Sequence, residues 1–308
     1  MAYHLIFSGQ GAQQVGMGRD LHEASSQARE RYREASEILG WDIADISFNG
    51  PESALTETRI CQPALYVQGY CIAEWLLSEG GLSVPDLRSA FGLSLGELTA
   101  LAVAGTFDFS SGLRIVAERG RLMQLSCEAT QGGMAALIGG NREAAESLAR
   151  DFGVDVANLN CPGQIVLSGD AAAIEKAISA APEAGFRMAK ALNVAGAYHS
   201  RLMEPAARDF REFLKGIVFE KPHLSVYTNT TGRPVEDPDE IRAALVRQVT
   251  GSVFFEDNLR NAVADSGCTE FLECGPGGVL AGFIKRIDRS WATHSLPDFD
   301  ALQTFARR

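Results

Sequence analysis

The sequence lacks several features that would place it in a specialised class of protein. No apolar run in its 308 residues is long enough to cross a membrane. Its six cysteines are scattered without a CxxC pair, which argues against a metal site and favours reduced thiols in the cytoplasm. No basic segment precedes the first short apolar run, so this run predicts a first strand and not a signal peptide.

Positive charge is scarce as well. The chain has 28 Lys and Arg against 39 Asp and Glu, and its formal net charge is −11. We therefore expect no nucleic-acid partner, because binding by counterion release needs a basic surface. The composition, with 46% hydrophobic and 22% charged residues, is that of an ordinary globular protein and excludes disorder or a coiled coil.

Strand and helix patterns alternate along the chain and predict an α/β fold. Residues 128–196 differ, because they follow the order βαββαβ of a ferredoxin-like domain. We expect this small domain to be inserted into a large domain made of residues 1–127 and 197–308. In the large domain we expect one long helix over residues 20–39, a last strand over residues 270–273, and a closing helix in GPGGVLAGFIKRI.

The segment from Gly92 to Gly96 reads G-L-S-L-G between an expected strand and an expected helix. The pattern G-x-S-x-G in this context is typical of a nucleophile elbow, whose sharp turn presents a serine at a helix N-terminus. Ser94 is therefore a candidate nucleophile. The alternative is a plain strand–helix turn in which Ser94 caps the helix.

A serine nucleophile needs a base, and the chain has only five histidines. His199 falls where the small domain ends and the large one resumes, a junction that naturally lines a cleft. The other four lie in a first strand, a polar helix start and irregular polar stretches: His4, His22, His223 and His294. Position and elimination favour His199 as the base. The alternative is a structural histidine at a helix start.

The segment GQGAQ directly follows the first strand. It is half of a dinucleotide-binding fingerprint, but Gln14 stands where the third glycine would be, so a Rossmann site is a weak interpretation. Alternatively, the glycines allow backbone N–H groups to converge near the elbow. The N–H groups of Gln10 and Leu95 would then form an oxyanion hole.

Arg119 lies on an apolar stripe of an expected helix, near Ile115, Leu122 and Met123. A buried guanidinium is costly unless it is paired. It could pair with a buried acid, or it could wait for a substrate carboxylate, which its planar fork binds with two hydrogen bonds. The sequence leaves both alternatives open.

Taken together, these segments resemble malonyl-CoA:acyl-carrier-protein transacylases of type II fatty acid synthesis and the related acyltransferases of polyketide synthesis. The resemblance covers nearly the whole chain in order, through SGQGAQQVGMG, GLSLGELTALAVAG, NLNCPGQIVLSGD, AGAYHSRLMEPA and ECGPGGVLAGFIKRI. It implies an α/β-hydrolase-like large domain with a ferredoxin-like insertion. It also implies ping-pong transfer of a malonyl group from malonyl-CoA, through a serine ester, to the phosphopantetheine thiol of holo acyl carrier protein. We expect a monomeric cytoplasmic enzyme without a metal or redox cofactor.

The resemblance also implies individual roles. Ser94 would be the nucleophile and His199 its base, oriented by the backbone carbonyl of Gln248, so that a dyad replaces a triad. Arg119 would bind the malonyl carboxylate and select malonyl over acetyl. The oxyanion donors and a cleft residue complete the set: Gln10, Leu95 and Asn160. Tyr198 is bulky where methylmalonyl-selective relatives tend to have a small residue, which favours malonyl.

Four positions depart from the family pattern. Leu93 replaces the usual elbow histidine, and we expect activity to survive because the dyad is intact. Ser8 replaces a common proline, which should affect only the rigidity of the turn. Ser252 and Phe255 stand where proline and tryptophan are usual, close to the segment that would orient His199.

Two other functions are possible for such a chain, a hydrolase and a carrier-binding module without activity. A hydrolase that clears acyl groups from carrier proteins is disfavoured because such relatives tend to lose the carboxylate-binding arginine. An idle carrier-binding module is disfavoured by the intact dyad. Because carrier proteins are acidic, we expect docking on a local basic patch, for which the alternative is an ordinary solvated helix end. Its candidate residues are Lys190, Arg201, Lys285, Arg286 and Arg289.

Overall fold

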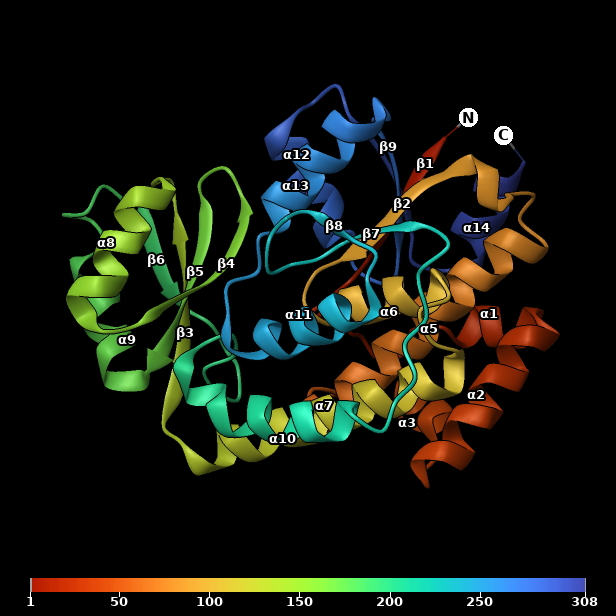
Figure 1. Ribbon diagram of the computed structural model, residues 1–308, viewed down its shortest axis with the longest axis horizontal. Helices are drawn as coiled ribbons and strands as arrows, with labels where there is room; N and C mark the ends of the chain where they lie inside the picture. The colour runs from red at the N-terminus through yellow and green to blue at the C-terminus, as the bar shows by residue number, and fades with distance from the viewer. Residues whose placement is uncertain (1, 308) are drawn as a thin grey trace.

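The computed structural model describes residues 2–307 and contains two β-sheets flanked by helices (Figure 1). In the described chain the larger sheet has six strands, in the order β10-β9-β1-β2-β7-β8. Neighbours are parallel except for the antiparallel pair β7 and β8. The strands are β1 (Tyr3–Phe7), β2 (Leu87–Gly92), β7 (Ser225–Tyr227), β8 (Pro234–Val235), β9 (Glu270–Cys274) and β10 (Ala292–Leu296).

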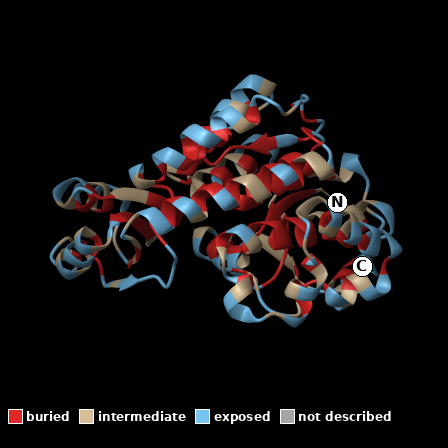
Figure 2. Cartoon of the chain, turned by 90° about the horizontal axis from the view of Figure 1, so that it is seen from below, coloured by how far each residue is buried: buried red, intermediate tan, exposed pale blue. Residues whose placement is uncertain are grey.

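Helices cover both faces of this sheet. The α-helices are α1 (Arg19–Ala24), α2 (Ser26–Leu39), α3 (Ile43–Asn49), α4 (Glu52–Leu55), α5 (Thr58–Ser78), α6 (Leu95–Val103), α7 (Phe109–Ala129), α10 (Glu204–Leu214), α11 (Pro238–Thr250), α12 (Phe255–Ser266), α13 (Val279–Ile287) and α14 (Phe299–Ala306). Short 3₁₀ helices are η1 (Val84–Asp86) and η2 (Arg201–Met203). Figure 2 shows buried residues concentrated where these central helices meet the sheet.

Strand β1 packs against helices on both faces of the larger sheet. Its side chains alternate in direction, so Leu5 and Phe7 enter the core beneath α5 and α6, while Ile6 enters a second core with Phe255 of α12 and Phe283 of α13. A strand buried on both faces reads as a continuous apolar run, which is why YHLIF could be predicted as a strand.

The smaller sheet has the order β4-β5-β3-β6 with antiparallel neighbours, and α8 and α9 cover it. Its elements are β3 (Gly132–Ile138), α8 (Arg142–Phe152), β4 (Asp155–Cys161), β5 (Gln164–Asp170), α9 (Ala171–Ala180) and β6 (Met188–Ala191). This is the predicted βαββαβ arrangement, and the predicted fold class is confirmed. The exact bounds 128–196 of an inserted domain stay a prediction.

Two sequence expectations for the large domain were wrong. The helix over residues 20–39 is divided, because Ser25 is extended and its side chain caps α2 by accepting from the N–H of Ala28. The strand β9 is not the last one, since β10 pairs with it and contains His294. The helices α12 and α14 were not predicted. Within residues 2–307, no helix has the length and apolar character to cross a membrane.

Candidate active site

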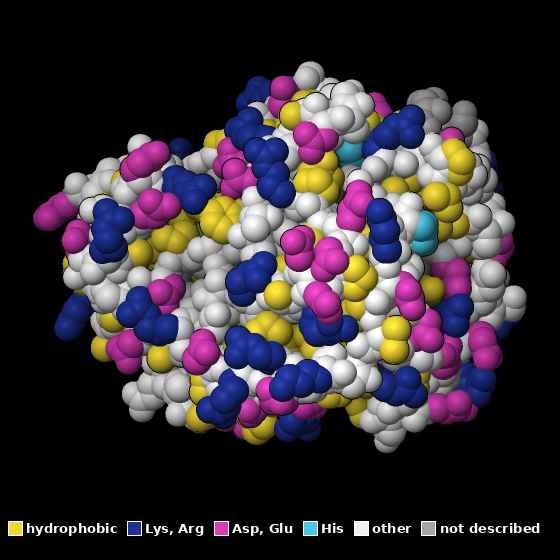
Figure 3. All heavy atoms as spheres, viewed as in Figure 1, with side chains coloured by type: hydrophobic (Ala, Val, Ile, Leu, Met, Phe, Trp, Pro, Cys, Tyr) yellow, Lys and Arg dark blue, Asp and Glu magenta, His cyan; other side chains and the backbone are white. Residues whose placement is uncertain are grey.

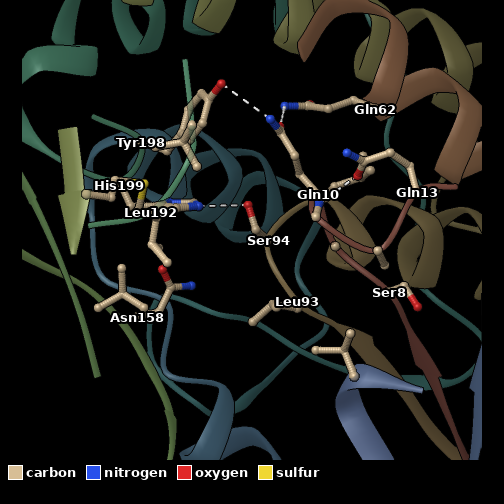
Figure 4. Close-up of a pocket in the computed structure, with 18 of the residues that line it drawn as sticks. Ser8, Gln10, Gln13, Gln62, Leu93, Ser94, Asn158, Leu192, Tyr198 and His199 are labelled. Atoms are coloured by element: carbon tan, nitrogen blue, oxygen red, sulfur yellow. Dashed lines mark hydrogen bonds between the residues drawn. The ribbon is translucent and has the colours of Figure 1, made fainter. Parts of the chain in front are cut away.

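A cavity of about 640 Å³ lies between the carboxyl ends of β1 and β2 and the smaller sheet (Figure 4). Ligands of parallel α/β sheets bind at this edge because the loops that follow the strands meet there. Its walls come from the loop after β1, the elbow, β3 to β5, the segment before η2, and α13. Lining side chains include Gln10, Leu93, Ser94, Asn158, Asn160, Tyr198, His199 and Phe283.

The turn at Ser94 has the geometry of a nucleophile elbow. Ser94 has φ 54° and ψ −100°, and its side chain makes no capping hydrogen bond to the helix it precedes. A Cβ on Gly92 would lie 2.3 Å from the carbonyl carbon of Gly96, and one on Gly96 would lie 2.2 Å from the Phe7 carbonyl oxygen. Both glycines are therefore required by close backbone approach, and the capping alternative does not describe this serine.

His199 lies beside Ser94. Its Nε2 is 2.7 Å from Ser94 Oγ, and its Nδ1 is 2.7 Å from the Gln248 carbonyl oxygen. Because a carbonyl oxygen only accepts, Nδ1 carries the proton and Nε2 presents its lone pair to the hydroxyl. Burial, assisted by the nearby Arg119 charge, lowers the pKa of His199 to about 4. The imidazole is thus neutral at pH 7 and able to accept the serine proton.

Arg119 is fully buried on α7 and aimed at the same hydroxyl. Its Nη2 donates to Ser94 Oγ at 3.0 Å and to Gln248 Oε1 at 2.8 Å, while Nη1 donates to Gln62 Oε1 at 2.7 Å. Its Nε has no hydrogen-bond partner within residues 2–307. Burial lowers the pKa of Arg119 to about 10, which leaves the guanidinium charged at pH 7.

All of these Arg119 partners are neutral, and none of the ion pairs within residues 2–307 includes Arg119. Glu97 is the acid whose charge raises the pKa of Arg119 against the effect of burial, but it accepts from Gln248 Nε2 and does not contact the guanidinium, which donates to Gln248 Oε1. Of the two alternatives left open by the sequence, a direct pair with a buried acid is therefore absent from this part of the chain. The arrangement is compatible with the second alternative, an external carboxylate beside Ser94.

Gln248 connects His199, Arg119 and the elbow. Beyond its contacts to His199 and Arg119, its Nε2 donates to the Ser94 carbonyl at 2.9 Å and to Glu97 Oε2 at 2.7 Å. Asn229 fixes the same turn, because its Oδ1 accepts from the Ser94 N–H at 2.7 Å and its Nδ2 donates to the Gly92 carbonyl at 2.8 Å. These contacts hold the elbow from the side opposite the cavity.

Sequence reasoning did not find Glu97 or Asn229. Glu97 is a buried charge in the otherwise apolar helix α6, and burial raises its pKa. Asn229 follows the carboxyl end of β7, the edge at which functional residues of parallel sheets gather. Both signals were present in the sequence. Asn229 is connected with Ser94 only by the strand order, and Glu97 acts on the site through its contacts with Asn229 and Gln248.

The proposed oxyanion donors are Gln10, in the loop after β1, and Leu95, the first residue of α6. The Leu93 N–H donates to the Phe7 carbonyl at 3.1 Å, and a Cβ on Gly9 would lie 2.4 Å from the Leu93 carbonyl oxygen. This contact brings the backbone of Gln10 next to the elbow. Since the Ser94 N–H is taken by Asn229, the N–H of Leu95 is the elbow's candidate donor. The role of both donors stays a prediction.

The strand β4 adds polar groups to the cavity wall. Asn158 and Asn160 are two residues apart and therefore point to the same face. Asn160 was predicted to line the cleft, whereas Asn158 was not. The Asn160 Oδ1 is buried without a hydrogen-bond partner within residues 2–307, and its expected role in the cleft stays a prediction.

The departures from the family pattern are accommodated in different ways. Leu93 lines the cavity, where it supplies an apolar wall. Ser8 Oγ donates to the Pro276 carbonyl at 3.5 Å, and Phe255 is fully buried against α13. Ser252 Oγ donates to the Val156 carbonyl of β4 at 2.5 Å. None of these residues displaces Ser94 from His199.

The fold and the elbow place this chain in the class of α/β acyltransferases, and residues 4–295 match the acyl transferase domain. The chain is 35% identical to the malonyl CoA-acyl carrier protein transacylase of Bacillus subtilis, over 97% of this chain and 94% of that protein. It is 38% identical to a polyketide biosynthesis malonyl CoA-acyl carrier protein transacylase of the same organism, over 92% of this chain and 96% of that protein.

A solved malonyl-transacylase, in complex with a type II polyketide synthase acyl-carrier protein, is similar throughout. It has a TM-score of 0.93 and 34% identity, with 100% of this chain and 99% of that chain covered. The chain belongs to the malonyl CoA-acyl carrier protein transacylase family.

Proposed function

We propose that the protein transfers a malonyl group from malonyl-CoA to the phosphopantetheine thiol of holo acyl carrier protein. The observation that carries this proposal is Arg119, a fully buried guanidinium whose Nη2 is 3.0 Å from Ser94 Oγ and whose protein partners are all neutral. A malonyl ester on Ser94 would place its distal carboxylate beside this charge, which has no direct ion-pair partner within residues 2–307. An acetyl group would leave the charge unpaired and is disfavoured for that reason.

The dyad supplies the proton transfers of the first half-reaction. Ser94 Oγ attacks the thioester carbonyl carbon while its proton passes to His199 Nε2. The Gln248 carbonyl, 2.7 Å from Nδ1, stabilises the resulting imidazolium. The tetrahedral oxyanion accepts hydrogen bonds from the N–H groups of Gln10 and Leu95. The carbon–sulfur bond then breaks, and His199 returns the proton to the departing coenzyme A sulfur.

The second half-reaction uses the same groups in reverse. The carrier's thiol gives its proton to His199 and attacks the malonyl ester of Ser94. The ester bond breaks, and the proton passes from His199 to Ser94 Oγ. A cavity of about 640 Å³ has room for an acyl group and a pantetheine arm but not for a folded carrier. We therefore infer that coenzyme A and the carrier use it in turn.

The state of the cysteines bears on the compartment in which the protein acts. All six cysteines are free thiols, and all lie within the described residues. Burial raises the pKa of Cys61, which lies near the loop after β1, to about 12 and keeps it protonated and unreactive. Unpaired cysteines in a chain of this size fit a reducing compartment, and we infer that the enzyme acts in the cytoplasm.

Intact-protein mass spectrometry tests the transfer itself. The protein is mixed with malonyl-CoA, then with holo carrier protein, and the Ser94→Ala variant is treated alike. A malonyl adduct that forms only on the wild type and then moves to the carrier supports the proposal. An adduct released mainly to water in the presence of carrier would favour an editing hydrolase instead.

A further inference from the structure

The smaller sheet does more than line the cavity. Its edge strand β4 is hydrogen-bonded to the segment that follows Gln248 and to the segment that follows His199. The Val253 N–H donates to the Ala157 carbonyl at 2.8 Å, and the Leu159 N–H donates to the Val253 carbonyl at 2.9 Å. Val253 comes five residues after Gln248, whose carbonyl orients His199. The segment at Val253, between α11 and α12, thus pairs with the free edge of the smaller sheet.

A second connection reaches the histidine segment directly. Asp155, the first residue of β4, accepts three hydrogen bonds from Arg201, which is two residues after His199. Asp155 Oδ2 accepts from the Arg201 backbone N–H at 3.0 Å and from Nε at 3.0 Å, and Oδ1 accepts from Nη2 at 2.7 Å. A carboxylate that accepts from a backbone N–H fixes the main chain and not only a side chain.

The side-chain part of this contact is the weaker part. The Arg201 side chain is 64% exposed and that of Asp155 is 26% exposed, and ion pairs this exposed to water add little. The backbone part acts on a strained segment, because His199 has φ 58°, a value that side-chain-bearing residues rarely adopt. Such a conformation persists only where the surroundings hold it.

We propose that Asp155 is a positioning residue for His199, acting through the backbone N–H of Arg201. The smaller sheet then sets the distance between the base and Ser94, in addition to lining the cavity. The inference rests on the proposed role of His199 as the base. It assigns Asp155 no contact with substrate.

Two substitutions at Arg201 separate the backbone bond from the ion pair. Arg201→Ala removes the guanidinium and keeps the N–H, whereas Arg201→Pro removes both. Proline suits this position, because Arg201 is the first residue of η2 and Ser200 before it is extended, with φ −132° and ψ 169°. Asp155→Ala removes the acceptor. Asp257→Ala is the matched control, since Asp257 lies 3.9 Å from Arg142 of α8 and joins the same two parts of the molecule without lining the cavity that contains His199.

The readout is the rate at which a small fluorophosphonate labels Ser94, measured with malonyl transfer. In labelling, Ser94 Oγ bonds to phosphorus, fluoride leaves, and the serine proton passes to His199, so neither coenzyme A nor carrier binding contributes. We expect Arg201→Pro and Asp155→Ala to lower labelling and kcat about ten-fold, because misplaced catalytic groups lose rate steeply. The KM for malonyl-CoA should stay within about two-fold, because the carboxylate and thioester contacts remain.

The control variants and the conservative variant have their own expected labelling rates. Arg201→Ala and Asp257→Ala should label at nearly the wild-type rate; because labelling involves no carrier, it does not depend on Arg201 as a candidate docking residue. Asp155→Asn, which keeps an acceptor oxygen, should recover most of the loss. Equal rates for Arg201→Pro and Arg201→Ala would overturn the inference, as would wild-type labelling of Asp155→Ala. If Asp155→Ala does not fold, the two Arg201 variants still decide. Wild-type labelling of His199→Ala would instead refute the proposed base.

Discussion

Ser94 and His199 face one another at 2.7 Å, and they are the two non-glycine residues within 2–307 that have a positive φ. Their φ values are 54° and 58°, in a region that costs about 1–3 kcal/mol for a residue with a side chain. The strain is confined to the pair that must meet, and the surrounding contacts maintain it. Asn229 and Gln248 hold the serine side, while Asp155 and Gln248 hold the histidine side.

The first prediction concerns the acid limb of activity. His199 must be neutral to accept a proton, and its pKa is lowered to about 4 by burial and by the Arg119 charge. The fluorophosphonate labelling rate should therefore stay high as the pH falls below 6.5 and decline near pH 4. Removing the positive neighbour in Arg119→Gln should raise the pKa of His199 and move the decline to higher pH. An unchanged profile in this variant would contradict the assignment.

The second prediction concerns folding stability and pH. His4 is buried, with Nδ1 2.7 Å from Ser89 Oγ, and burial lowers its pKa to about 4. The unfolded chain binds a proton near pH 6.5 and the folded chain does not, so stability is lost as the pH falls between these values. From pH 8 to pH 5 the loss should be about 2 kcal/mol for this group. Urea unfolding should show a shallower pH dependence in His4→Gln, and an identical slope would contradict the prediction.

The third prediction concerns the loop beside the elbow. A Cβ on Gly9 would lie 2.4 Å from the Leu93 carbonyl oxygen, so Gly9→Ala must push this loop and the Gln10 N–H away from Ser94. We expect kcat to fall about ten-fold or more, because a displaced oxyanion donor loses most of its effect. Gly282→Ala on α13 is the control, since its Cβ would meet nothing within 4 Å. Equal kcat values for the two variants would argue against a donor in this loop.

The fourth prediction concerns carrier docking. Lys285 and Arg286 lie in the last turn of α13, whose Phe283 lines the cavity, and Arg286 Nη1 donates to Gln164 Oε1 of β5 at 2.8 Å. Figure 3 shows Lys and Arg side chains over the region of α12 and α13, with Asp and Glu side chains among them and hydrophobic side chains nearby. Such a surface would attract an acidic carrier.

Charge reversal tests this surface. Lys285→Glu with Arg286→Glu should raise the KM for holo carrier about five-fold and leave the KM for malonyl-CoA unchanged. Lys215→Glu, at the residue that follows α10, reverses an exposed charge elsewhere and should change neither value. Equal effects on both substrates would show that these charges do not serve carrier docking.

The sequence predicted the parts of the site that depend on local geometry. The elbow could be found because its two glycines and the flanking strand and helix are consecutive in the chain. Arg119 could be found because a charge on an apolar helical stripe demands a partner. The contact between His199 and the Gln248 carbonyl was supplied by the family resemblance, since no local pattern joins residues so far apart.

Other parts depend on strand order, which the sequence does not state. Asp155 and Asn229 are ordinary surface-type residues until β4 and β7 bring them to the histidine and the elbow. The strand β10 was missed because ATHSL is short, half-buried and mostly polar at the sheet edge. The helix break at Ser25 was missed because a serine can occupy either a helix interior or a cap.

The selectivity of Arg119 is the most direct test of the proposed function. The values of kcat/KM for malonyl-CoA and acetyl-CoA are measured in the wild type and in Arg119→Ala. If the guanidinium binds the malonyl carboxylate, the preference for malonyl should fall about a hundred-fold, chiefly through loss of malonyl transfer. A variant that keeps the wild-type preference would contradict this role, and with it the identification of malonyl as the group transferred.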